Sequence, residues 1–88
     1  MNRSTDLLTA ARADALFTSL LSSASQPLST DEVTTAIRCA VRAHGGIRGC
    51  AVEIAGEFGD HPETAVTRMR WALRVVEAAY ARDLTPAG

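Results

Sequence analysis

The side chains in this sequence that are best suited to chemistry are two cysteines and two histidines. Cys39, His44, Cys50 and His61 follow one another with four, five and ten residues in between. Zinc sites usually bring their ligands in pairs about two to four residues apart, so that one turn holds both members of a pair. Both cysteines also fall within predicted helices, where a free cysteine usually packs as a small apolar side chain. We therefore expect no metal site.

Residue patterns for nucleophilic catalysis and for phosphate binding are also missing. A nucleophile requires a neighbouring base that a third group orients, whereas His44 and His61 stand at the predicted ends of helices. The glycine-rich stretch 44–49 lacks the Gly-Lys-Ser/Thr end of a P-loop, and no strand precedes it as in a dinucleotide-binding motif. We expect a protein that is not an enzyme, with no catalytic residue, no cofactor and no small-molecule substrate.

Arginines give the last part of the chain a local positive charge. The nine basic residues are all Arg, and against ten acidic residues they leave the whole chain with a net charge of −1. Between positions 61 and 82, however, four arginines accompany only two glutamates. In a helix, Thr67, Arg70 and Arg74 share one face, from which they would reach phosphate oxygens. The alternative is a hydrated surface on which an arginine pairs with Glu77.

These residues need helices to position them, and the composition favours an all-α fold. Sixteen of the 88 residues are alanine, which is the strongest helix former and a poor strand residue. A chain of this length forms one domain with a thin core. We predict a single four-helix domain over residues 1–88, with short turns and a long C-terminal helix. The helices span about 5–23, 30–44, 48–58 and 61–82, and a Ser-rich loop covers 22–29.

Helix boundary signals are clearest around the second predicted helix. Ser29 and Glu32 have the S-x-x-E spacing of a capping box, in which each side chain accepts a hydrogen bond from the backbone N–H of the other residue. The pair Gly45-Gly46 marks the end of this helix, because glycine tolerates the left-handed backbone conformation. In the last helix, apolar residues step by three and four positions and predict a heptad stripe made of Val66, Met69, Leu73, Val76 and Tyr80.

A further pattern lies between the third and fourth predicted helices. It contains, in order, Ile54-Ala55, Gly59, Pro62-Glu63-Thr64 and Arg68. Over residues 47–74 the chain resembles the helix-turn-helix of sigma-factor region 4 and of small bacterial transcriptional regulators. The resemblance implies that the alanine lets two helices approach, that the glycine makes the turn, and that the second helix enters the major groove of DNA.

The leading functional expectation is a small non-enzymatic regulator of transcription that binds DNA as a homodimer. The residues expected to contact DNA are Thr64, Thr67, Arg68, Arg70 and Arg74. The alternative is a protein–protein interaction adaptor, or a homodimeric helical module that binds no nucleic acid. The residues expected at an interface are Phe17, Leu20, Leu21, Trp71 and Val75.

The location of the protein is predicted from what the sequence lacks. It has no run of about 18 to 20 apolar residues that would span a bilayer. The stretch 1–17 contains acids and no small-residue cleavage site of a secretory signal. Two cysteines are too few for a disulfide framework. We therefore expect a cytoplasmic protein without a membrane partner.

Overall fold

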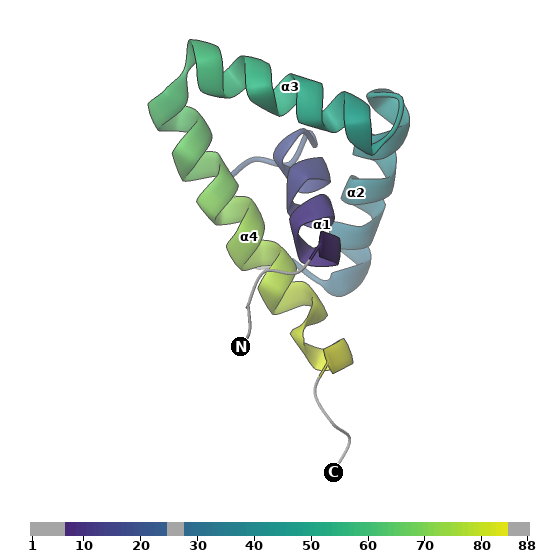
Figure 1. The fold of residues 1–88 in the computed structure, drawn as a ribbon. Helices are drawn as coiled ribbons and strands as arrows, with labels where there is room; N and C mark the ends of the chain where they lie inside the picture. Colours follow the sequence, from purple (N-terminus) through teal and green to yellow (C-terminus); the bar gives the residue numbers. More distant parts are fainter. Residues whose placement is uncertain (1–6, 25–27, 85–88) are drawn as a thin grey trace.

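The computed structural model describes residues 7–24 and 28–84, and within these ranges the chain is helical with no strand. It contains α1 (Leu7–Phe17), α2 (Thr30–Ala43), α3 (Ile47–Asp60) and α4 (Pro62–Leu84). α2, α3 and α4 form three sides of a triangle, and α1 lies across its centre, packed most extensively on α4 (Figure 1). This arrangement confirms the predicted all-α class with four helices and a long C-terminal helix.

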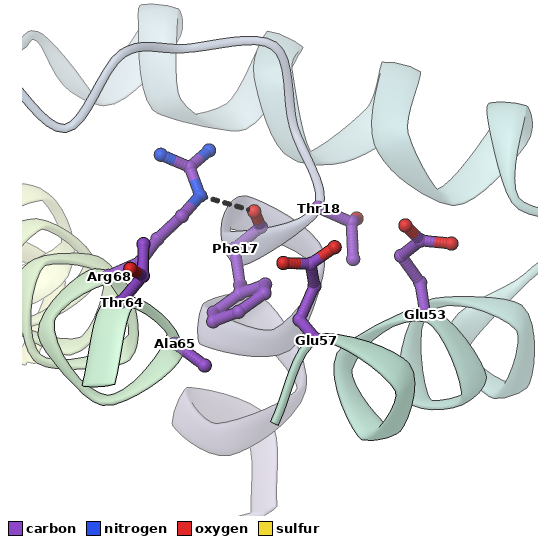
Figure 2. Close-up of a pocket in the computed structure, with 7 residues that line it drawn as sticks. All are labelled: Phe17, Thr18, Glu53, Glu57, Thr64, Ala65 and Arg68. Atoms are coloured by element: carbon purple, nitrogen blue, oxygen red, sulfur yellow. Dashed lines mark hydrogen bonds between the residues drawn. The ribbon is translucent and has the colours of Figure 1, made fainter. Parts of the chain in front are cut away.

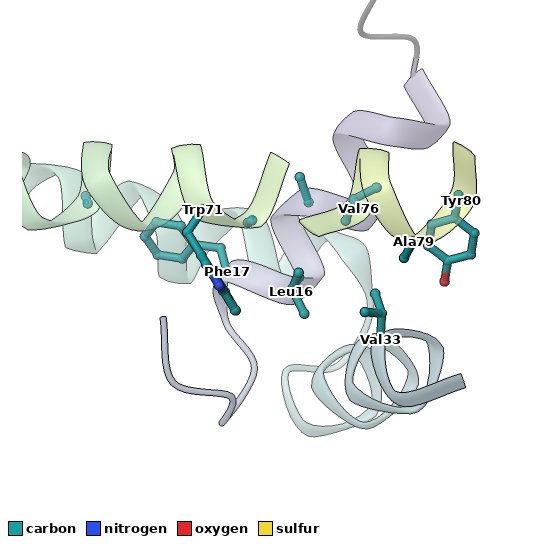
Figure 3. Packing of buried hydrophobic residues seen from close by; sticks show 10 residues of the cluster. Leu16, Phe17, Val33, Trp71, Val76, Ala79 and Tyr80 are labelled. Carbon is teal, nitrogen blue, oxygen red and sulfur yellow. The ribbon is translucent and has the colours of Figure 1, made fainter. Parts of the chain in front are cut away.

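The core lies where α1 meets α2 and α4. Its largest fully buried members include Leu16, Val33 and Val76, one from each of these helices (Figure 3). Two hydrogen bonds of 2.6 Å tie α2 to the C-terminal half of α4. In the first, the hydroxyl of Thr30 donates to a carbonyl of α4, and in the second the hydroxyls of Thr34 and Tyr80 meet. α2 is thereby fixed to α4 at one corner of the triangle.

The predicted heptad stripe of α4 is only partly buried. Val76 and Tyr80 are core residues, whereas Val66 is 39% exposed. A neighbouring line of small residues is buried instead, and it consists of Ala65, Ala72 and Ala79. The buried face of α4 therefore includes this line of alanines and is turned away from Val66.

α1 ends at Phe17 rather than at the predicted Ser23, although the apolar spacing continues to Leu21. The hydroxyls of Thr18 and Ser19 donate to the carbonyls three residues before them, at 2.8 and 2.6 Å. Such local side-chain bonds compete with the helical hydrogen-bond ladder and favour a turn. The loop thus begins before the predicted position 22. The predicted helix start at residue 5 and residues 25–27 of the loop lie outside the described ranges.

The boundaries of α2 agree with the sequence prediction. The hydroxyl oxygen of Ser29 accepts from the N–H of Glu32 at 3.1 Å, and the carboxylate of Glu32 accepts from the N–H of Ser29 at 2.8 Å. At the other end, Gly45 and Gly46 have φ angles of 76° and 113°. The N–H of Gly46 donates to the carbonyl of Val41 at 2.8 Å, which closes the helix in a Schellman motif.

The junction between α3 and α4 differs from the predicted turn. α3 continues through Gly59 to Asp60, and His61 is the single residue between the two helices. Among the described glycines only Gly45 and Gly46 have positive φ, so Gly59 does not make the turn. The break falls at His61 because the ring of Pro62 disfavours the α conformation in the residue before it.

A second feature of the helix-turn-helix pattern also differs. Ala55, expected to let two helices approach, is exposed on α3, and its neighbour Ile54 packs against the core instead.

Candidate functional site

The outer face of α4 carries arginines that the sequence analysis places there. Arg70 and Arg74 are exposed and one turn apart, and Thr67 lies on the same face nearer the start of the helix. Within the described residues neither guanidinium has a hydrogen-bond or ion-pair partner. Glu77, the acid that the alternative interpretation pairs with an arginine, is exposed and makes no such bond. Both arginines are therefore available to an anionic ligand.

Thr64 and Thr67 lie at the start of α4, beside the loop that follows α1. Together with Ser23, Glu63 and Arg68 they line a shallow hollow. The hydroxyl of Thr67 donates to the carbonyl of Glu63 at 3.1 Å. The hydroxyl of Thr64 is exposed and has no partner among the described residues, so it is free to donate to a ligand.

Arg68 is placed differently from the other predicted DNA contacts. Its guanidinium lies over the end of α1, where Nε donates to the carbonyl of Phe17 at 2.6 Å (Figure 2). Nη1 donates to the hydroxyl of Ser23 at 2.8 Å, and Nη2 donates to the carbonyls of Ser19 and Leu21 at 3.0 and 2.9 Å. Four of the five guanidinium N–H groups are thus used inside the chain. Arg68 holds the loop against α4, and in this structure it is not free to contact DNA.

Aromatic rings complete the surroundings of Arg68. Its Cζ atom lies 4.7 Å from the ring centre of Trp71 and 5.9 Å from that of Phe17. Burial lowers the pKa of Arg68, because the charged form loses part of its hydration. No described carboxylate forms an ion pair with it, so carbonyl dipoles and ring faces stabilise the cation.

A hollow of about 170 Å³ lies beside this cation, between α3, α4 and the end of α1. Figure 2 shows Glu53 and Glu57 of α3 on one side of the hollow and Arg68 on the other. Its lining contains no histidine or cysteine that would serve as base or thiol nucleophile. In the part of the chain that the structure describes, no three His, Cys, Asp or Glu side chains are grouped closely enough to hold a metal ion.

The cysteines and histidines occupy separate structural positions. Cys50 is buried, and its sulfur lies 3.5 Å from the hydroxyl oxygen of Thr18. Cys39 is exposed on α2. His44 and His61 are the C-caps of α2 and α3. In the described structure no hydrogen bond joins any two of these four side chains.

The predicted interface residues fall into three groups. Phe17 and Trp71 are each 5% exposed and belong to the core, so their size serves internal packing and they are not free to bind a partner. Leu21 and Val75 are partly buried against that core. Leu20 is 104% exposed, because α1 ends before it and the loop carries it away from the core.

Sequence reasoning missed a groove on the outer side of α2. It has a volume of about 700 Å³ and lies between α2 and the loop residues 18–21. Its α2 wall includes a series of small apolar residues at helical spacing, namely Ala36, Cys39, Ala40 and Ala43. This series is visible in the sequence. It is less conspicuous than the larger apolar residues of α4, and only the fold brings the loop beside it.

None of the described helices combines the length and the apolar character needed to cross a membrane. No protein-family model, no curated protein and no solved structure matches this chain.

Proposed function

We propose that this chain is a small, non-enzymatic regulatory protein that binds DNA through the outer face of α4. The observation that carries the proposal is the pair Arg70 and Arg74, which are exposed on one helix face without any partner among the described residues. Arginines that neutralise phosphates release counterions, and this release supplies much of the affinity of proteins for DNA. The hydroxyl of Thr64 lies on the same helix, has no partner among the described residues and is a suitable donor to a phosphate oxygen.

The proposal depends on this arginine face rather than on the form of the α3–α4 turn. The sequence pattern at residues 47–74 supports α4 as the helix that meets DNA, while Arg68 is excluded from the contact set because its guanidinium is bonded to the loop. Two arginines provide few phosphate contacts for one chain. A symmetric dimer would double their number.

The test is the salt dependence of binding to a labelled double-stranded DNA fragment of random sequence, measured by fluorescence anisotropy. The logarithm of the binding constant falls with the logarithm of the salt concentration, with a slope of about −0.9 for each phosphate contacted. We expect Arg70→Ala combined with Arg74→Ala to reduce the magnitude of this slope by about 2 per chain bound. The double variant should also bind the fragment more weakly at low salt.

The matched control is Arg38→Ala combined with Arg48→Ala, which removes two exposed arginines from α2 and α3. This control changes the net charge by the same amount but leaves the face of α4 intact. Absence of DNA binding by the natural protein at low salt would refute the proposal. An equal loss in both double variants would show that binding depends only on net charge.

A second candidate function is a homodimeric or partner-binding helical module that contacts no nucleic acid. The groove beside α2 favours it, because a mostly apolar hollow of about 700 Å³ is typical of a surface that another molecule covers. Association through the groove is itself compatible with DNA binding, since the groove and the arginines lie on different helices. If the natural protein binds no DNA in the measurement above, the second function is the one that remains.

A further inference from the structure

The groove beside α2 has a protruding side chain at its own edge. Leu20 lines the groove and is 104% exposed, so it projects from the surface beside the hollow. The α2 wall opposite the loop includes small residues that leave room for an incoming side chain, among them Ala36, Cys39 and Ala43. Polar residues complete this wall toward the two ends of the helix, namely Asp31, Glu32, Thr35 and His44. One face of the molecule therefore presents both an apolar projection and an apolar hollow.

A face with both features is complementary to a second copy of itself. In a two-fold interface the same surface is used by both subunits, so each must supply the projection that enters the other's hollow. A different partner could fill the groove with an apolar side chain of its own, but it would offer no hollow to receive Leu20. The shape of this face thus favours a second copy over an unrelated occupant.

The charges at the two ends of α2 favour one direction of pairing. The first turn of α2 carries Asp31 and Glu32, and its last turn carries Arg42, followed by the C-cap His44. When two α2 helices lie antiparallel, the acidic end of each faces the basic end of the other. The helix dipoles are then also opposed, which is favourable. A parallel pairing would bring Asp31 beside the Asp31 of the other copy.

We propose that the chain forms a two-fold symmetric homodimer in which α2 packs antiparallel against α2 of a second copy, with Leu20 of each subunit seated in the groove of the other. The middle of α2, where Cys39 is exposed, then lies close to the symmetry axis. The outer face of α4 stays uncovered, because α2 and α4 lie on different sides of α1 (Figure 1). This inference does not depend on DNA binding.

The first experiment is sedimentation equilibrium of the full chain at several concentrations. We expect a mass of twice 9.3 kDa for the natural sequence. Leu20→Glu should raise the dissociation constant at least tenfold, because a carboxylate would enter an apolar hollow. The matched control is Val52→Glu on α3, whose side chain is 73% exposed away from the groove and whose replacement should leave the dimer intact.

A mass of 9.3 kDa at every concentration would overturn the proposal and would leave the groove to a different partner. So would a dimer that Leu20→Glu does not weaken, since another surface must then hold it. Because this measurement involves no DNA, its failure is separate from any failure of the DNA-binding proposal.

The second experiment tests the direction of the pairing. Asp31→Arg alone and Arg42→Asp alone should each weaken the dimer, because like charges then meet on both sides of the axis. The double variant with both substitutions should restore it to within a few-fold of the natural protein. Failure of the double variant to recover, while both single variants weaken the dimer, would overturn the antiparallel arrangement.

Cross-linking supplies a check of position. A short bis-maleimide reagent should join two chains through Cys39, and Cys39→Ser should abolish the product, because Cys50 is buried and unavailable to the reagent. A dimer that gives no cross-link through Cys39 would show that the subunits meet elsewhere.

Discussion

Among single residues, Arg68 makes the largest number of described side-chain hydrogen bonds. It joins the end of α1, the following loop and α4 through three carbonyls and one hydroxyl, while its guanidinium also lies over the ring of Trp71. The carbonyl of Phe17, which would accept the N–H of Leu21 if α1 continued, is occupied by Nε of Arg68. One side chain thus contributes to the end of a helix, positions a loop and covers an edge of the core.

Replacing Arg68 should therefore destabilise the fold. We expect Arg68→Ala to lower the free energy of unfolding by about 2–3 kcal/mol, since hydrogen bonds from a charged donor are lost and partly buried carbonyls lose their partners. Arg68→Lys should recover only part of this loss, because an ammonium group lacks the planar fork of the guanidinium. Urea denaturation followed by circular dichroism measures the change.

Arg70→Ala is the control for Arg68, since Arg70 is exposed on the same helix without a described partner. This substitution should change the free energy of unfolding by no more than about 0.5 kcal/mol, as most surface substitutions do. Equal effects of the two substitutions would contradict the structural role given to Arg68.

Asp14 provides a prediction about pH. It lies on α1, where burial raises the pKa of its carboxyl above the ordinary value of 3.8. The charged form is therefore less favourable in the folded state than in the unfolded state, and the carboxylate destabilises the fold at pH values above its folded-state pKa. Asp14→Asn should raise the melting temperature at pH 7. The difference should disappear once the pH falls below 3.8, where both states bind the proton.

Thermal unfolding of the natural protein and of Asp14→Asn at pH 7 and pH 3 tests this expectation. A difference of the same size at both pH values would assign the effect to packing or to helix propensity instead of charge.

At the scale of helices, local signals were predictable and distant ones were not. Both ends of α2 follow from residues within a few positions of each other, and the structure confirms the capping box at Ser29 and the end at Gly45-Gly46. The predicted end of α1 was wrong because the hydroxyls of Thr18 and Ser19 favour a turn, and because the carbonyl of Phe17 accepts from Arg68, which lies 51 positions further along the chain. Periodicity describes one helix at a time and cannot include such a partner.

The same distinction applies to the candidate site. The helical period alone places Arg70 and Arg74 on the outer face of α4, and the structure agrees. The helical period does not reveal that the guanidinium of Arg68 turns toward α1. Nor does it reveal that the side chain of Trp71 is buried, with 5% of its surface exposed. Both facts depend on where α1 packs, and the groove beside α2 depends on the path of the loop.

Gly49 is the glycine whose lack of a side chain matters most for how two helices join. A Cβ atom at this position in the first turn of α3 would overlap the backbone carbonyl of His44, whereas one on Gly56 would meet nothing. In a helix, alanine is more favourable than glycine by about 1 kcal/mol when no contact opposes it. Gly49→Ala should therefore destabilise the protein by about 1–3 kcal/mol, because the α2–α3 junction must shift.

Gly56→Ala, in the same helix, should stabilise the protein by about 0.5–1 kcal/mol. Denaturant midpoints of the two variants give the comparison directly. If Gly49→Ala is also stabilising, the close approach between α3 and the carbonyl of His44 is not required by the fold.

At the scale of the whole molecule, the thin core and the exposed apolar side chains both limit the stability of a single chain. A domain of this size has a total stability of only about 4–13 kcal/mol. Leu7, Leu20 and Val52 each leave most of their side chain in water, and they contribute little to that total. Val76 and Tyr80 of the heptad stripe are already buried against α1 and α2, so no second subunit is required to bury them. Association through the groove would instead bury Leu20.

Dimerisation through the groove makes thermal stability depend on protein concentration. If only the folded chain dimerises, a hundredfold rise in protein concentration raises the free energy of unfolding by about 1.4 kcal/mol for each chain. This is half of the increase for one dimer, which contains two chains. For a domain of this length that corresponds to an increase of about 5–10 °C in melting temperature. The melting temperature of Leu20→Glu should depend less on concentration across this range, and Val52→Glu should keep the dependence of the natural protein. Differential scanning calorimetry measures all three proteins, and a constant melting temperature for the natural chain would contradict coupling between folding and association.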